Sequence, residues 1–166
     1  EKKIPVVIAE RGDVLHISKD AALALHTPFA SFIDASPKNV HDAMIVAKLS
    51  FVNARAFLMG DAESEIEYAL LAAEDDLRAD VLKIGHHGSK TSSTNFFLSA
   101  VRPAYAVISS GRRNRYGHPV QEVLDRVRAI GATLKRTDEE GDITFVSEGE
   151  PFELKNVFTP IIGNSP

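Results

Sequence analysis

Four residues of metal-binding types follow three separate apolar segments of this sequence. Asp61 follows the first segment, the adjacent histidines His86 and His87 follow the second, and His118 follows the third. One carboxylate and two or three imidazoles form a ligand set that suits zinc, and also manganese or iron. The order of these residues therefore predicts a divalent-metal site, provided that the fold brings the ends of the three segments together.

Each of these residues also has a purely structural interpretation. Asp61 could cap the helix expected after it, because aspartate is a favoured N-cap residue. The histidine pair could be solvated in a polar loop, and His118 could simply precede the next helix. Among the other histidines, His16 and His26 alternate with apolar residues, which favours structural roles, and the role of His41 stays open.

The loop that carries the histidine pair is rich in glycine, hydroxyl groups and lysine. Residues 81–84 are typical of a short buried strand, and the sequence then turns at Gly85 into His-His-Gly-Ser-Lys-Thr-Ser-Ser. Open α/β sheets usually hold their ligands in such loops, at the carboxyl ends of strands. We expect Ser89 and Lys90 to bind an anionic group of the substrate. A serine nucleophile at Ser89 also stays open, although nothing specifies it.

Charge is unevenly distributed along the chain, whose net charge is −4. Residues 61–80 contain eight acidic residues, whereas residues 81–119 contain none. If the two segments fold together, the loop side is locally positive and suits a phosphate-bearing substrate. The basic residues of the second segment are Lys83, Lys90, Arg102, Arg112, Arg113 and Arg115.

Length and composition restrict the class of protein. The 166 residues predict one domain, which we place at residues 1–158 with a tail at 159–166. The absence of cysteine excludes thiolate chemistry and disulfides. No apolar run approaches the roughly 20 residues of a membrane span, so we expect no direct membrane insertion by this segment. Because the chain starts at Glu1 rather than methionine, we expect a piece of a longer protein.

The apolar patterns predict an α/β (α+β) fold, with a mixed sheet and helices packed on one face. The strands at 14–17 and 21–26 should pair in antiparallel fashion, and residues 27–39 should form a long loop. The expected strands span residues 4–8, 14–17, 21–26, 43–51, 55–59, 81–84, 105–109, 133–136, 143–146 and 152–157. The expected helices span residues 62–77, 95–101 and 119–130.

Three motifs together resemble the metallo-β-lactamase-like hydrolase domain of the ComEC competence proteins and their free-standing relatives. They are Gly-Asp at position 61, His-His-Gly-Ser-Lys from position 86, and Arg-Tyr-Gly-His-Pro, which contains His118. The resemblance implies that Asp61 bridges two metals and that His87 and His118 are metal ligands, with His86 as the alternative to His87. On this basis Asp61 and His87 are also the expected catalytic residues.

The same resemblance places Arg115 and Tyr116 on the loop before the last ligand, where we expect them to bind substrate. It covers only the second half of such a domain, because the His-x-His-x-Asp-His motif of the first half is absent here. We therefore expect half of an αββα sandwich, with the missing N-terminal half supplied by another segment. The family's Asn-Asp-Asn-Ser-like segment reads His41-Asp42-Ala43-Met44 here, where other branches of the superfamily place a ligand histidine.

The implied function is that of a metal-dependent phosphodiesterase or nuclease acting on DNA or another phosphate ester. Zinc is the first choice of metal and manganese the second, and the chain alone should bind metal weakly and turn over little. Two other classes stay open: a non-catalytic binding module, and a lactonase- or phosphorylcholine-esterase-type hydrolase. A half-domain should also expose a sheet face or edge, to be covered by partner strands or by a homodimer. Both the bacterial cytoplasm and the extracytoplasmic face of the membrane stay open as locations.

Overall fold

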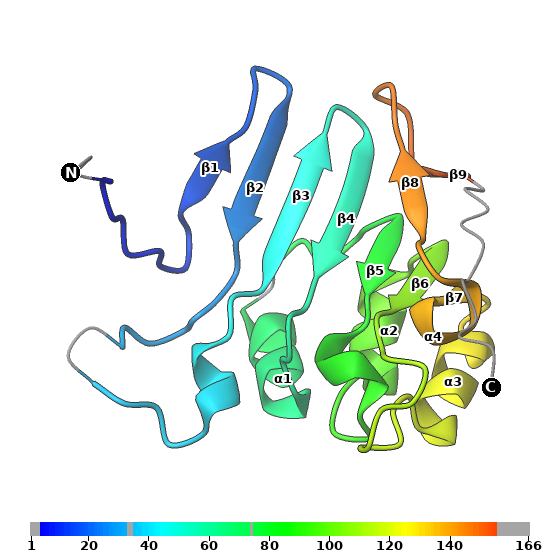
Figure 1. Cartoon of the computed structure of the whole chain (residues 1–166). Helices are drawn as coiled ribbons and strands as arrows, with labels where there is room; N and C mark the ends of the chain where they lie inside the picture. The colour runs from blue at the N-terminus through cyan, green and yellow to red at the C-terminus, as the bar shows by residue number, and fades with distance from the viewer. Residues whose placement is uncertain (1–3, 33–34, 74, 156–166) are drawn as a thin grey trace.

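A computed structural model describes residues 4–32, 35–73 and 75–155. These residues form a seven-stranded mixed sheet in which the strands lie in sequence order, with a separate two-stranded sheet, β8–β9 (Figure 1). The pairs β1–β2, β2–β3 and β3–β4 are antiparallel, whereas β4 to β7 run parallel to one another. The expected α/β class with a mixed sheet is confirmed. The strands are β1 (Val14–His16), β2 (Ala21–Leu25), β3 (Ala47–Phe51), β4 (Ala54–Leu58), β5 (Val81–Lys83), β6 (Tyr105–Ile108), β7 (Thr133–Arg136), β8 (Thr144–Val146) and β9 (Glu153–Lys155).

Three helices connect the parallel strands and pack on one face of the sheet. Phe57, Leu82 and Ala106 lie side by side on that face and are fully buried. These three residues belong to one apolar core together with residues of all three connecting helices. The helices therefore pack against the β4–β7 half of the sheet and stabilise it. The helices are α1 (Ser64–Ala72), α2 (Asn95–Val101), α3 (Gln121–Ala129) and the short α4 (Thr137–Glu140), with 3-10 turns η1 (Val40–Ala43) and η2 (Gly85–Gly88).

The other face of the sheet is apolar and only partly covered. Leu15, Leu23 and Leu49 lie in register on this face, and Leu15 is 50% exposed. The β8–β9 hairpin covers part of the far half, where the Phe145 and Tyr105 rings are 5.2 Å apart. The described residues therefore leave part of this apolar face exposed.

Several predicted boundaries are wrong. The strand expected at residues 4–8 does not form, and Ile4, Val6 and Val7 are each more than 80% exposed. Apolar residues make a strand only where a neighbouring edge accepts their hydrogen bonds, and no strand pairing includes these residues in the described chain. The strand expected at residues 43–51 begins only at Ala47, as β3. Its first expected residue belongs to the 3-10 turn η1, which spans Val40–Ala43.

The helix expected at residues 62–77 ends at Ala72. Downstream of it, Asp75 forms an ion pair with Arg11, and Asp76 forms one with the buried Lys48 of β3. These long-range contacts hold the segment against the sheet and outweigh its helical pattern. The strand expected at 152–157 is β9, and its last two residues, like the expected tail at 159–166, lie outside the described residues. None of the helices in the described part of the chain is both long and apolar enough to cross a membrane.

Candidate metal centre

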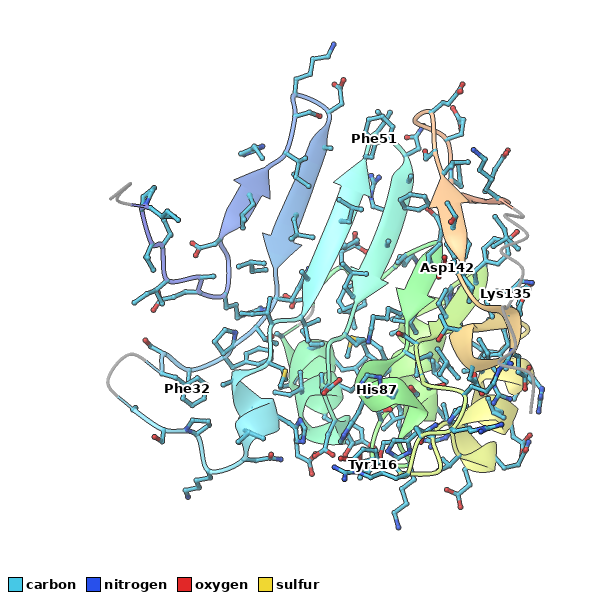
Figure 2. The ribbon with its side chains drawn as sticks, viewed as in Figure 1. Phe32, Phe51, His87, Tyr116, Lys135 and Asp142 are labelled. Carbon is cyan, nitrogen blue, oxygen red and sulfur yellow. The ribbon has the colours of Figure 1, made fainter. Side chains whose placement is uncertain are left out.

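The loops that follow β4, β5 and β6 meet at the carboxyl edge of the parallel strands. Asp61 follows β4, His86 and His87 form the middle of η2 after β5, and His118 lies between β6 and α3. Figure 2 shows His87 and Tyr116 at this edge. The predicted ligands are therefore brought together by parallel strands that end side by side.

The backbone of η2 is tightly constrained. His86 and His87 both have left-handed conformations, with φ of 45° and 55°. Such conformations cost about 1–3 kcal/mol each in non-glycine residues and cluster at functional sites. A Cβ at Gly85 would lie 2.6 Å from a backbone oxygen of the loop after β4, and one at Gly88 would lie 2.6 Å from Pro119 Cβ. Only glycine allows these two close approaches, which fix the histidine pair against both neighbouring loops.

A buried carboxylate anchors the rest of this loop. Glu67 of α1 is fully buried and accepts hydrogen bonds from the backbone N–H groups of Ser93 and Thr94. Burial raises the pKa of Glu67, and these two hydrogen bonds oppose the shift. The Ser92 hydroxyl also donates to the Gly85 carbonyl at 2.8 Å. The loop is therefore held at both ends by buried hydrogen bonds.

Asp61 and His87 face each other at the edge of the sheet. His87 Nδ1 lies 2.6 Å from the Ser109 carbonyl oxygen, which can only accept, so Nδ1 carries a proton. His87 Nε2 lies 3.4 Å from Asp61 Oδ1. With a proton on Nδ1, Nε2 is an acceptor, as is the carboxylate oxygen, so a cation between these two partly exposed atoms would stabilise their contact. A ligand histidine usually donates its other N–H to a carbonyl or carboxylate, as His87 does here.

His118 lies near His86 and lines one pocket together with His87. Its ring centroid is 5.9 Å from that of His86, and its Nδ1 is buried without a hydrogen-bond partner among the described residues. Burial lowers the pKa of His118, and the neighbouring imidazoles of His86 and His87 lower it further. The neutral form of this ring is therefore favoured, and neutral imidazole is the form that binds metals. Among the described residues, however, Asp61, His87 and His118 do not form a group whose ligand atoms all lie within 4.8 Å of one another.

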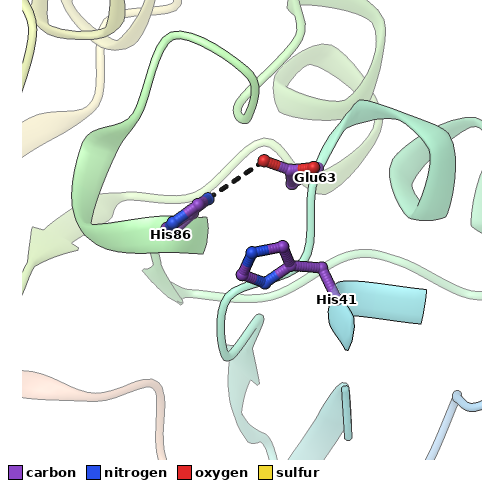
Figure 3. Close-up of side chains that lie close together, drawn as sticks. All are labelled: His41, Glu63 and His86. Atoms are coloured by element: carbon purple, nitrogen blue, oxygen red, sulfur yellow. Dashed lines mark hydrogen bonds and ion pairs between the residues drawn. The ribbon is translucent and has the colours of Figure 1, made fainter. Parts of the chain in front are cut away.

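Two residues of the site were not among the predicted ligands. Ligand atoms of His41, Glu63 and His86 all lie within 4.8 Å of one another (Figure 3). His86 Nδ1 lies 3.1 Å from Glu63 Oε1, and the His41 and His86 ring centroids are 4.6 Å apart. The position of Glu63 at a helix start indicates only a favourable dipole interaction. The role of His41 stayed open in the sequence, although the resemblance places it where other branches of the superfamily have a ligand histidine.

The predicted substrate-binding residues lie in unlike surroundings. Ser89 is buried, with its hydroxyl 3.0 Å from that of Thr91, whereas Lys90 is exposed. Arg115 is exposed and donates to the Tyr116 hydroxyl at 2.8 Å. A surface pocket opens beside them, and its lining residues are His87, Ser110, Gly111, Asn114, Tyr116 and His118. The pocket places the predicted metal ligands next to open space that a substrate can enter.

The chain is similar to segments of three longer proteins. It is 34% identical over 145 residues to ComE operon protein 3 of Bacillus subtilis, covering 87% of this chain and 18% of that protein. It is 44% identical over 111 residues to competence protein ComA of Neisseria gonorrhoeae, covering 65% of this chain and 16% of that protein. It is 41% identical over 86 residues to recombination protein 2 of Haemophilus influenzae, covering 52% of this chain and 11% of that protein.

No family model matches the chain. The three proteins are much longer than this chain, which spans less than a fifth of each. The similarity therefore concerns one segment of these proteins and not their whole length. The homologues of this chain are ComEC-family competence proteins.

Proposed function

We propose that this chain contributes the metal-binding edge of a metal-dependent hydrolase in a ComEC-type competence protein. The substrate class is DNA or another phosphate ester, which makes the complete protein a phosphodiesterase or nuclease with a role in DNA uptake. The observation that carries the proposal is the Asp61–His87 contact at 3.4 Å, in which the other ring nitrogen of His87 already donates to a carbonyl. The names of the competence homologues support the biological setting.

Asp61, His87 and His118 would hold the metal, with His86 as the alternative to His87. Zinc is the first candidate and manganese the second, because imidazole and carboxylate donors suit both. A divalent cation supplies Lewis acidity and lowers the pKa of water bound to it. The chain's own contribution is orientation: the Ser109 carbonyl fixes the ring of His87, and Asn114 fixes the backbone of His118 through hydrogen bonds of 2.9 and 2.6 Å.

The surface around the pocket supports an anionic substrate. Arg112, Arg113 and Arg115 are exposed on the loop after β6, and Lys90 is exposed on the loop after β5. The guanidinium of Arg115 lies 5.0 Å from the centre of the Tyr116 ring, which orients the cation. A cluster of cations beside the proposed metal ligands attracts phosphate groups to the site.

The uncovered sheet face supports the need for further chain. We propose that strands of the longer protein cover Leu15, Leu23 and Leu49 and bring the remaining metal ligands. The chain on its own should then turn over little. Sedimentation of the chain should show self-association, and Leu49→Lys should abolish it. A monodisperse monomer without an exposed apolar patch would count against this part of the proposal.

The function is tested in the complete protein, with a phosphodiester substrate and added zinc or manganese. Asp61→Ala and His87→Ala should each lower kcat/KM by about 10²–10⁴, because each removes a group that positions the metal. His16→Ala is the control, since His16 is exposed on β1. Unchanged rates in both site variants would overturn the proposal. Unchanged DNA affinity without any metal-dependent hydrolysis would instead indicate a binding module, and preference for a lactone or a phosphorylcholine ester would change the substrate class.

A further inference from the structure

We infer that Thr137 is a positioning residue for His87, acting through the peptide bond between Ser109 and Ser110. The inference deepens the proposed function, and its effect on the reaction rate rests on that function. Its structural part, the orientation and tautomer of the His87 ring, is measured without hydrolysis.

Thr137 lies beside the segment after β6 because β6 and β7 are parallel neighbours. The last register pair of the two strands is Ile108 with Arg136, and α4 begins at the next residue, Thr137. The strand backbone of β7 therefore ends where the segment after β6 still has hydrogen-bonding groups to satisfy. The side chain of Thr137 takes the place of that strand backbone.

The Thr137 hydroxyl makes two hydrogen bonds to one residue. It accepts from the Ser110 N–H at 3.0 Å and donates to the Ser110 carbonyl at 3.0 Å. Because the carbonyl takes the hydroxyl proton, a lone pair of the oxygen remains for the N–H. Both bonds need a hydroxyl, since an aliphatic side chain of the same shape can neither donate nor accept.

These bonds fix a peptide plane whose other side holds His87. The Ser110 N–H and the Ser109 carbonyl belong to one trans, planar peptide, so they point in opposite directions. The Ser109 carbonyl oxygen accepts from His87 Nδ1 at 2.6 Å. Rotating this carbonyl away from His87 would break the bond to Thr137, and hydrogen bonds at both ends of one peptide also strengthen each other. Thr137 thereby supports the tautomer of His87 that carries its proton on Nδ1.

The peptide depends on this support because it lies at the surface. Ser109 and Gly111 are exposed, and Ser110 is only half-buried. Surface loops are more mobile than the elements they connect. A carbonyl that must keep one orientation toward an imidazole therefore needs a partner on a more rigid element.

The short helix α4 is such an element, because charged side chains tie it to β7. The Arg136 guanidinium donates to both carboxylate oxygens of Asp138, at 3.1 and 2.6 Å. Although burial opposes the change, Arg136 lowers the pKa of Asp138, so this carboxylate stays charged. Glu140 accepts from the Arg136 N–H at 3.1 Å and from Lys135 Nζ at 2.7 Å. Thr137 lies between these contacts and is held in place by them.

The test removes the hydroxyl and keeps the shape of the side chain. Nitrogen-15 NMR of the histidine rings in the metal-free chain, at a pH where imidazole is neutral, should show His87 with its proton on Nδ1. His87→Ala identifies the signal. Thr137→Val should shift this ring toward a mixture of the two tautomers, and Thr137→Ser should restore the original signal. Thr133→Val is the matched control and should change nothing, because Thr133 is exposed at the other end of β7.

The effect on rate is measured in the complete protein. Thr137→Val should lower kcat about tenfold with little change in KM, because it disturbs the orientation of a site residue and removes no contact with substrate. Thr137→Ser should restore the rate. If the tautomer responds as expected but the complete protein shows no metal-dependent hydrolysis, only the proposed function fails.

Two outcomes of the NMR experiment overturn the inference: an unchanged His87 signal in folded Thr137→Val, and a Thr137→Ser variant that behaves like the valine variant. Circular dichroism checks folding, and Thr137→Ala replaces Thr137→Val if that variant is unfolded. Amide hydrogen exchange needs no substitution. Rapid exchange of the Ser110 N–H in the unmodified chain would also overturn the inference, because the hydroxyl would then not hold this amide.

Discussion

His86 and His87 are neighbours in the sequence, yet they face different carboxylates. His87 is exposed and lies 3.4 Å from Asp61, whereas His86 is half-buried, 3.1 Å from Glu63 and packed against His41. Left-handed backbone at both positions turns the two side chains apart, with ring centroids 6.4 Å from each other. One His-His dipeptide can therefore supply two separate ligand positions, and a motif match alone does not say which histidine serves which site.

The largest expected effect comes from replacing Glu67, which anchors the loop that carries both histidines. Glu67→Ala leaves the buried N–H of Ser93 and the partly buried N–H of Thr94 without their acceptor, so we expect a loss of about 2–4 kcal/mol of unfolding free energy. Urea denaturation measures the loss. Glu65→Ala is the control on the same helix, because Glu65 is exposed and should change stability by less than about 0.5 kcal/mol. A loss no larger than that of the control would show that the loop does not depend on this carboxylate.

The next prediction concerns the position of His87 in its loop. Gly88→Ala places a Cβ 2.6 Å from Pro119 Cβ at a residue with φ of +82°, so we expect about 1–3 kcal/mol of destabilisation and displacement of His87. Hydrolysis by the complete protein should therefore fall. Gly131→Ala is the matched control, since Gly131 has a similar φ of +76° and open space around it. Equal behaviour of the two variants would mean that the contact with Pro119 is unimportant.

A smaller effect concerns the pH dependence of stability. Because burial raises the folded-state pKa of Glu67 above its unfolded value of 4.5, the folded protein binds more protons than the unfolded protein above that pH. Stability contributed by this group is therefore full below the unfolded pKa and falls as the pH rises through the folded pKa. In Glu67→Gln this decline should disappear, as measured by denaturation at a series of pH values. An unchanged pH profile would show that Glu67 is not the group responsible.

The smallest expected effect comes from replacing the exposed arginines on the loop after β6. Arg112→Ala and Arg113→Ala should each reduce the slope of log K against log salt for DNA binding by about 1, if each arginine contacts a phosphate. Arg102→Ala is the control, because Arg102 lies at the end of α2 and donates to the Ser99 carbonyl. Equal slopes for all three variants would remove the argument for a phosphate-binding surface here.

Local sequence signals predicted much of the β4–β7 half of the sheet. The helix expected at residues 95–101 is α2, because its ends have local causes: the Thr94 side chain caps the first turn and Arg102 adopts a left-handed conformation after the last. The loop-end positions of Asp61, His87 and His118 also follow from apolar strands in sequence order. Parallel strands connected by helices place the loops at their carboxyl ends along one edge of the sheet. The order of strands and loops in the sequence therefore predicted that these three residues lie at the same edge.

The failures share a different cause, which is contact between distant segments. The cluster of His41, Glu63 and His86 depends on η1, where Asn39 accepts from the His41 N–H and donates to Glu63, which is distant in sequence. The early end of α1 depends on ion pairs with Arg11 and Lys48, which no local pattern reveals. The apolar residues 4–8 form no strand because strand formation needs a partner edge as well as composition.

The hydrogen bonds of Glu67 also determine how the sheet edge fluctuates. Since Ser93 and Thr94 are tied to α1, this end of the loop can open only if the carboxylate separates from both amides, and their amide protons should exchange slowly with solvent. The edge that carries the histidines is then already ordered before any ion or substrate arrives. Little conformational entropy remains to be lost on binding, so more of the interaction energy is available as affinity.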